Sequence, residues 1–197
     1  TIDGFLALKS DLWLMAYGFY ILELVDSFTV ENSANRPLFD LLLDTLHWLN
    51  QADSNETVLR YFELHLLHYL GYRPELYRCV KCNSPLKPVL NFFNSSQGGM
   101  LCPYCNSKEN RHCEQSEAIS LKLSSPLSVD ALKILRLWQN CDYATARRVK
   151  VKADLSSELE RVLQKYIVYL LQREVKSMAW MEKLKKKLPL DNYGRGN

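Results

Sequence analysis

Four cysteines, arranged as two C-x2-C pairs, constrain this chain more than any other feature of its sequence. Nineteen residues separate the pairs, which consist of Cys79, Cys82, Cys102 and Cys105. Two residues between thiolates let both sulfurs reach one tetrahedral ion from a tight turn, a spacing typical of a zinc ribbon or knuckle. Asn83 and Asn106 follow the pairs, and asparagine tolerates the left-handed backbone that such turns often need. The sequence therefore predicts a structural Zn2+ site with four thiolate ligands.

This donor set favours a structural metal over a catalytic one. Four thiolates complete the tetrahedron, whereas a catalytic zinc keeps one position for water or substrate. A nucleobase deaminase places H-x-E before its P-C-x-x-C pair, but here His112-Cys113-Glu114 follows both pairs. His65 and His68 share a helix face with no third ligand on it, so we interpret them as ordinary helix-surface residues. We predict no catalytic residues.

The composition is that of a globular protein without a membrane segment. Of its 197 residues, 47% are hydrophobic and 24% charged, which allows one sizeable core and a small satellite. The apolar stretch around residues 12–25 is interrupted by Tyr, Gly and Glu23, so it does not resemble a membrane span or a signal sequence. Six cysteines in such a chain indicate metal binding rather than disulfides, because the cytosol is reducing. We expect a cytoplasmic protein.

Residues 1–76 are predicted to form a helical region with three helices. The first is apolar on nearly all sides, which suits a buried helix. The second begins after Asn35, with Pro37 in its first turn. The third begins at Asp53 and ends at Gly71.

The pattern changes at residue 77, and residues 77–106 are predicted to form the zinc knuckle. Val89–Phe93 has the character of a strand, and Gly98-Gly99 ends a turn before a second short strand. A hairpin would therefore bring the two cysteine pairs together. Residues 107–127 are mostly polar and aperiodic, so we predict a loop or an insertion.

Residues 128–190 are predicted to form the C-terminal helices and to pack on residues 1–76 as one domain. The last helical pattern is uninterrupted until Pro189, which indicates one very long helix or two helices joined near Val175. Residues 191–197 are expected to be a disordered tail. The predicted fold class is mainly α: a helical domain with an inserted four-cysteine zinc knuckle on a short β-hairpin.

Basic residues are concentrated in the last third of the chain. From Asp142 onward there are 13 Lys and Arg against 7 Asp and Glu, whereas the first 141 residues carry 12 against 15. We expect DNA phosphate or an acidic peptide to contact a basic run and two later cations, namely Arg147, Arg148, Lys150, Lys152, Arg173 and Lys176. The cluster Lys185–Lys187 fits a solvated helix end instead.

Several segments resemble the bacterial recombination mediator family RecO. The run YFELHLLHYLGYRPEL at residues 61–76, which leads directly into the first cysteine pair, looks like that family's helix and the start of its zinc knuckle. Gly98-Gly99 before the second pair fits as well, and so does QREVKS at residues 172–177. The order of helix, knuckle and helical tail covers nearly the whole chain, which is more specific than the cysteine pairs alone.

The resemblance implies a non-enzymatic mediator of DNA repair and recombination in the RecFOR pathway. Such a protein binds single- and double-stranded DNA, the acidic tail of single-stranded-DNA-binding protein, and RecR. It anneals complementary strands and helps to load RecA, in the bacterial cytoplasm in association with the nucleoid. The family begins with a DNA-binding OB barrel, whereas this chain starts at Thr1 in what looks like the helix after that barrel. We therefore expect a fragment or truncated form with weak DNA binding, and an insertion at residues 107–117.

Two other functions remain open. A zinc-ribbon adaptor in transcription or another assembly would contact its partner through the knuckle surface, at residues such as Lys81, Lys87 and Tyr104. A zinc hydrolase or deaminase would require an open coordination position on the metal.

Overall fold

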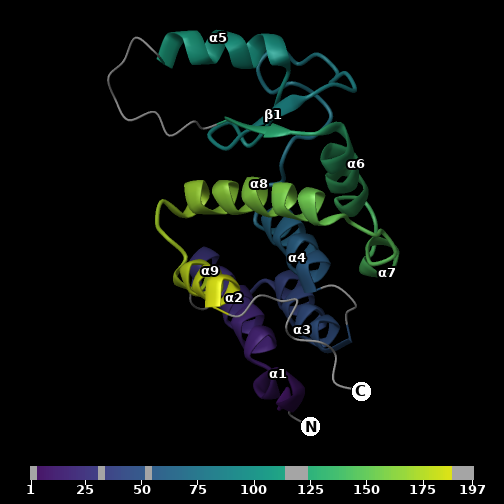
Figure 1. Ribbon diagram of the computed structural model, residues 1–197, viewed down its shortest axis with the longest axis vertical. Helices are drawn as coiled ribbons and strands as arrows, with labels where there is room; N and C mark the ends of the chain where they lie inside the picture. Colours follow the sequence, from purple (N-terminus) through teal and green to yellow (C-terminus); the bar gives the residue numbers. More distant parts are fainter. Residues whose placement is uncertain (1–3, 31–33, 52–54, 114–123, 188–197) are drawn as a thin grey trace. The chain divides into compact units, whose positions relative to one another are not determined.

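The structure is a computed structural model that describes residues 4–30, 34–51, 55–113 and 124–187 (Figure 1). It divides into two compact units. The first combines Thr1–Asp53 with Arg173–Asn197, and the second is Ser54–Gln172. Both units join a part of residues 1–76 to a part of residues 128–190. The expectation that these two regions form one domain stays a prediction.

The first unit is a group of helices in which α2 is central. Its described helices are α1 (Leu6–Ser10), α2 (Leu12–Phe28), α3 (Arg36–Gln51) and α9 (Lys176–Lys187). α2 packs against the other three, and its side chains Tyr20, Ile21 and Leu24 are completely buried. The prediction of a buried first helix is confirmed for one face only, because Phe19 and Leu22 of α2 are 55% and 46% exposed. Asp11 separates a short α1 from α2.

Side-chain caps determine where the helices of the first unit begin. Asp11 Oδ1 accepts hydrogen bonds from the backbone N–H groups of Trp13 and Leu14, at 2.7 and 2.9 Å, and so caps α2. Asn35 Oδ1 accepts the N–H of Leu38 at 3.1 Å, which confirms the predicted start of the second helix. Asp53, the predicted start of the third, lies outside the described residues.

In the second unit, α4 packs against α8, and two shorter helices pack on them. The helices that carry this packing are α4 (Asn55–Tyr69), α6 (Val129–Trp138), α7 (Tyr143–Ala146) and α8 (Ala153–Leu171). Gly71, with φ of 82°, ends α4 as predicted, and Gln172, with φ of 52°, ends α8. The long C-terminal pattern is therefore two helices, α8 and α9, and the chain between them contains Val175.

A three-stranded antiparallel sheet carries the cysteine region. The strands are β1 (Asn91–Asn94), β2 (Gly99–Leu101) and β3 (Ser124–Leu127), in the order β2-β1-β3. The predicted hairpin is β1–β2, with Phe93 opposite Met100. The third strand was not predicted; it pairs with β1 and places Ser125 opposite Phe93. α5 lies on one face of the sheet and α8 on the other (Figure 1).

Part of the predicted loop at residues 107–127 is helical instead. α5 runs from Pro103 to Cys113, and residues 124–127 are strand β3. Pro103 stands at the first helical position, where its missing N–H costs nothing. The helix has almost no apolar stripe, so hydrophobic periodicity could not reveal it. Residues 114–123 lie outside the described part.

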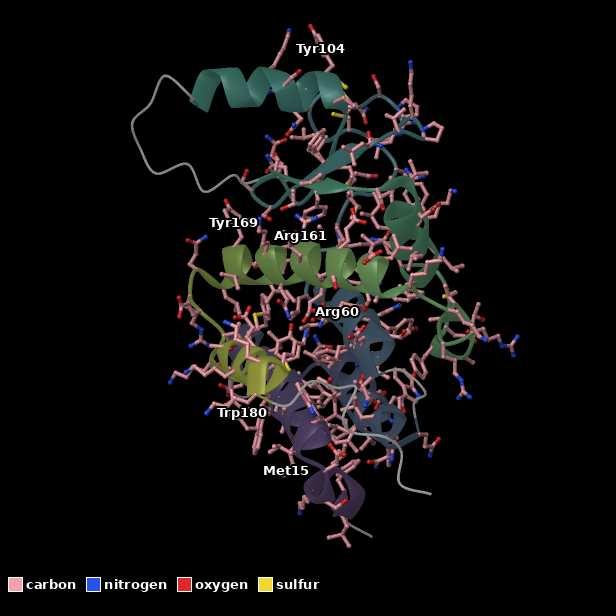
Figure 2. The ribbon with its side chains drawn as sticks, in the orientation of Figure 1. Met15, Arg60, Tyr104, Arg161, Tyr169 and Trp180 are labelled. Atoms are coloured by element: carbon pink, nitrogen blue, oxygen red, sulfur yellow. The ribbon has the colours of Figure 1, made fainter. Side chains whose placement is uncertain are left out.

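Groups outside the sheet form hydrogen bonds at both of its edges. Beyond β2, the N–H of Met100 donates to Glu75 O and the N–H of Val80 donates to Met100 O, each at 2.9 Å. Beyond β3, Arg161 Nη2 of α8 donates to Pro126 O at 3.0 Å (Figure 2). In the described residues, helices are too short or too polar to cross a bilayer.

Candidate metal centre

The structure brings the four predicted cysteine ligands together. The Sγ atoms of Cys79, Cys82, Cys102 and Cys105 all lie within 4.8 Å of one another. Cys79 and Cys105 are buried, whereas Cys82 is exposed and Cys102 is half-buried. In the part of the chain that the structure describes, this is the one group of three or more His, Cys, Asp or Glu side chains close enough to share a metal ion.

The sulfur geometry fits a tetrahedral ion. A tetrahedron with Zn–S bonds of about 2.3 Å has sulfur–sulfur edges of about 3.8 Å. Cys82 Sγ and Cys102 Sγ, which belong to different pairs, are 4.0 Å apart. The donor set can therefore hold one metal ion, and it is compatible with Zn2+. The identity of the ion stays a prediction.

The two cysteine pairs are built in different ways. After the first pair, Asn83 has the expected left-handed backbone, with φ of 58°, and its N–H donates to Cys79 O at 2.8 Å. The second pair lies at the start of α5, and the N–H of Asn106 donates to Cys102 O at 3.0 Å as in a helix. The expectation of a left-handed residue is confirmed for Asn83 and wrong for Asn106, because α5 continues through it.

Two glycines allow the hairpin to approach the knuckle. Gly98 has φ of 64°, and a Cβ on Gly99 would lie 2.6 Å from Val80 Cγ1 and 2.8 Å from Glu75 O. Only glycine therefore fits at position 99 without displacing its neighbours. The close approach seats Cys79 and Cys105 in a small apolar cluster with Leu101.

The thiols of the centre differ in acidity. Hydrogen bonds with the Ser84 side chain and backbone lower the pKa of the exposed Cys82 to about 6. Burial raises the pKa of Cys105 to about 12, and contacts with the other cysteines act in the same direction. A bound divalent cation favours the deprotonated form of every ligand. Metal binding would therefore release the proton of Cys105 and weaken at low pH.

The structure divides the six predicted basic contacts between the two units. Arg147, Arg148, Lys150 and Lys152 follow α7 and are all exposed, in the second unit. The other two belong to the first unit. Arg173 Nη2 donates to Ser27 Oγ at 2.7 Å, and the backbone N–H of Lys176 donates to Glu23 Oε1 at 2.8 Å.

His65 makes a contact between two helices. Its Nε2 lies 3.0 Å from the backbone oxygen of Trp138, which joins α4 to α6. Burial is the main reason that the pKa of His65 is lowered. The interpretation as an ordinary helix-surface residue is therefore wrong for His65, which is half-buried, whereas His68 is exposed as expected.

The sequence did not reveal a set of hydrogen-bonded, exposed residues near the segment that leads to Cys79. It contains Arg73 and Tyr77, joined through the Asn140 amide by hydrogen bonds of 2.9 Å on each side. The one available signal was the repeated Tyr-Arg pair at residues 72–73 and 77–78. Nothing in the spacing placed α6 beside it.

Comparisons with known proteins identify the family of the chain. A family model described as "Recombination protein O C terminal" matches residues 9–179. The chain is 36% identical over 184 residues to "DNA repair protein RecO" of Dehalococcoides mccartyi strain 195, which covers 93% of this chain and 68% of that protein. The proteins of the same name from Roseiflexus sp. and Bacillus pumilus are each 33% identical, and the matches cover 95% and 97% of this chain and 62% and 70% of theirs. The resemblance drawn from the sequence is confirmed, and the chain belongs to the RecO family.

Proposed function

We propose that the chain is the helical, zinc-containing part of a DNA repair and recombination mediator. It acts by binding and without an enzymatic step. Its partners are DNA, RecR and the acidic tail of single-stranded-DNA-binding protein, and through them it supports strand annealing and RecA loading. The curated relatives are named as DNA repair proteins, which supports the general role.

The observation that carries a binding role is the basic loop, residues 147–152. Four of its six residues are cations, none is acidic, and all four cationic side chains are exposed. Exposed cations with no acid among them attract phosphate, and their binding is weakened by salt because counterions are released on binding. We assign DNA phosphate to this loop.

The cations of the first unit lie in different surroundings, which suit a peptide tail. Lys176 lines a hollow of about 590 Å3 together with the exposed apolar side chains Phe19, Leu22 and Trp180. An acidic tail that ends in Phe offers both an apolar ring for the hollow and a carboxylate for Lys176. Glu23 also lines the hollow, but its two carboxylate oxygens accept the N–H groups of Lys176 and Ser177.

Two binding measurements test these assignments. The full chain should bind a fluorescent acidic peptide with a C-terminal Phe at moderate salt, and Trp180→Ala should weaken that binding without changing DNA affinity. DNA binding should be weak and should fall steeply with salt, and replacing Arg147 and Arg148 with Gln should reduce the slope of log K against log salt by about 1.4 to 1.8. No detectable peptide affinity would remove the peptide role, and tight DNA binding that is insensitive to salt would remove the phosphate assignment.

One observation favours the knuckle adaptor as a second candidate. Tyr104 of α5 is 64% exposed and projects away from the sheet (Figure 2), with Lys108 Nζ 4.6 Å from its ring centroid. A protein partner could cover this ring. Loss of partner binding in Tyr104→Ala, with zinc retained, would support the adaptor, whereas unchanged binding would count against it.

A further inference from the structure

Two exposed tyrosines of the second unit stand four residues before and four residues after Arg73. Tyr69 is the last residue of α4, and Tyr77 lies two residues before Cys79. Their side chains are 41% and 47% exposed. Exposed aromatic rings of this kind are not explained by the hydrophobic core.

Hydrogen bonds through Asn140 connect Tyr77 to Arg73, and Tyr69 lies beside the His65 ring. Arg73 Nη2 donates to Asn140 Oδ1, and Asn140 Nδ2 donates to Tyr77 Oη, both at 2.9 Å. On the other side, the ring centroids of His65 and Tyr69 are 6.5 Å apart. Burial is the largest cause of the lowered His65 pKa, and the positive charge of Arg73 acts in the same direction.

Arg136 completes the group from α6. Its guanidinium carbon lies 4.8 Å from the centroid of the Tyr77 ring, so the cation covers part of the ring while nearly half of the side chain stays exposed. We define the tyrosine–arginine surface by these residues: Tyr69, Arg73, Tyr77, Arg136 and Asn140.

The charge of this region is positive. Three arginines lie in or beside the surface: Arg73, Arg78 and Arg136. The nearby acids include Asp142, two residues after Asn140, and Glu75, whose Oε1 accepts the backbone N–H groups of Tyr77 and Arg78 at 2.7 and 3.0 Å. Exposed rings with a surplus of guanidinium groups are complementary to a polyanion that also presents aromatic faces.

We propose that the tyrosine–arginine surface binds single-stranded nucleic acid, with bases stacked on Tyr77 and Tyr69 and a backbone phosphate on Arg73. Stacking on aromatic side chains tolerates every base, but it needs base faces that a duplex keeps buried. The surface would therefore favour single strands, whereas the basic loop contacts phosphates of either form. The inference rests on the proposed DNA-binding function and adds a second contact region to it.

Fluorescence anisotropy with the full chain tests this proposal, using a labelled oligothymidylate and a labelled duplex at several salt concentrations. Tyr77→Ala should weaken binding of the single strand about tenfold and leave the duplex unaffected, and Tyr77→Phe should behave as the unchanged chain. Arg73→Gln should lower the slope of log K against log salt by about 0.7 for the single strand. Tyr69 lies outside the knuckle, in α4. Tyr69→Ala should likewise weaken binding of the single strand and leave the duplex unaffected.

Matched controls separate this surface from general damage. Phe39→Ala removes an aromatic ring of α3 that is 61% exposed and has no assigned binding role, and it should leave single-strand affinity unchanged. Zinc content shows whether Tyr77→Ala keeps the knuckle.

If Tyr77→Ala and Tyr69→Ala bind the single strand as tightly as the unchanged chain, or bind single strand and duplex with equally weakened affinity, the proposal is wrong. If the basic-loop variants lose binding but these do not, only this inference fails. If the unchanged chain binds neither oligonucleotide, the proposed DNA contact fails with it.

Discussion

Arg136 and Leu76 are joined by two hydrogen bonds, because Nε and Nη2 of the guanidinium both donate to the Leu76 carbonyl oxygen, at 2.9 and 2.7 Å. One turn further along, Gln139 Nε2 donates to Pro74 O at 2.9 Å. The end of α6 thereby holds the segment that leads to the first cysteine pair. The knuckle is thus connected to the helical part by side chains as well as by the chain itself.

Replacing Arg136 with Met should destabilise the folded chain by about 1–3 kcal/mol, because both donors to the Leu76 carbonyl are lost. Urea unfolding followed by circular dichroism measures this change. Lys133→Met on the same helix is the matched control; Lys133 is exposed and pairs with Asp130 at the surface, so its loss should cost at most about 0.5 kcal/mol. Equal effects of the two substitutions would contradict the role assigned to Arg136.

Removing one thiolate should damage folding first and partner binding only as a consequence. Cys79→Ala deletes a buried ligand, so we expect loss of bound zinc and a lower urea midpoint. Zinc content, unfolding and peptide binding measured on the same sample check the order. Cys141→Ala, a cysteine outside the cluster, should retain zinc. A zinc-free Cys79→Ala chain that is fully folded and has lost only partner binding would show that the knuckle is a recognition element.

Gly99→Ala should destabilise the chain by about 1–3 kcal/mol, because the added methyl group would overlap Val80 and the Glu75 carbonyl. Gly18→Ala is the matched control, and its expected effect on stability is the opposite. Gly18 lies within α2 and has nothing within 4 Å of the added Cβ, so alanine should stabilise the helix by up to about 1 kcal/mol. Thermal unfolding of both variants measures the difference. A neutral Gly99→Ala would mean that the hairpin does not approach the knuckle so closely.

Glu23 should make stability depend on acid pH. Burial alone would raise the pKa of Glu23, but hydrogen bonds from Ser177 and Lys176 prevail and hold that pKa below its ordinary value of 4.5. A carboxyl group whose pKa is lower in the folded chain stabilises it above pH 4.5, and the contribution disappears as the pH falls through the folded value. Glu23→Gln should therefore be less stable than the unchanged chain at pH 7 and closer to it at low pH. Parallel loss of stability in both chains on acidification would contradict this assignment.

Local patterns allowed the helices and the metal ligands to be predicted. The apolar residues of α2 and the Asn35 cap leave signals within a few residues, and the C-x2-C spacing implies its own geometry. α5 was missed because its sequence is polar and its start depends on the second cysteine pair. β3 was missed because Ser124–Leu127 becomes a strand only by pairing with β1, about thirty residues earlier. The tyrosine–arginine surface needs α6 beside residues 73–77, a contact that no local pattern encodes.

The hydrogen bonds at the edges of the small sheet affect how this unit can bind other molecules. An exposed edge strand offers a row of backbone donors and acceptors to any extended chain. Here residues 75–80 already occupy the positions beyond β2. At β3, Pro126 has no N–H to offer and its carbonyl is bound to Arg161. An extended peptide therefore cannot pair beyond β2, and at β3 the Pro126 position offers it neither a backbone donor nor a free carbonyl.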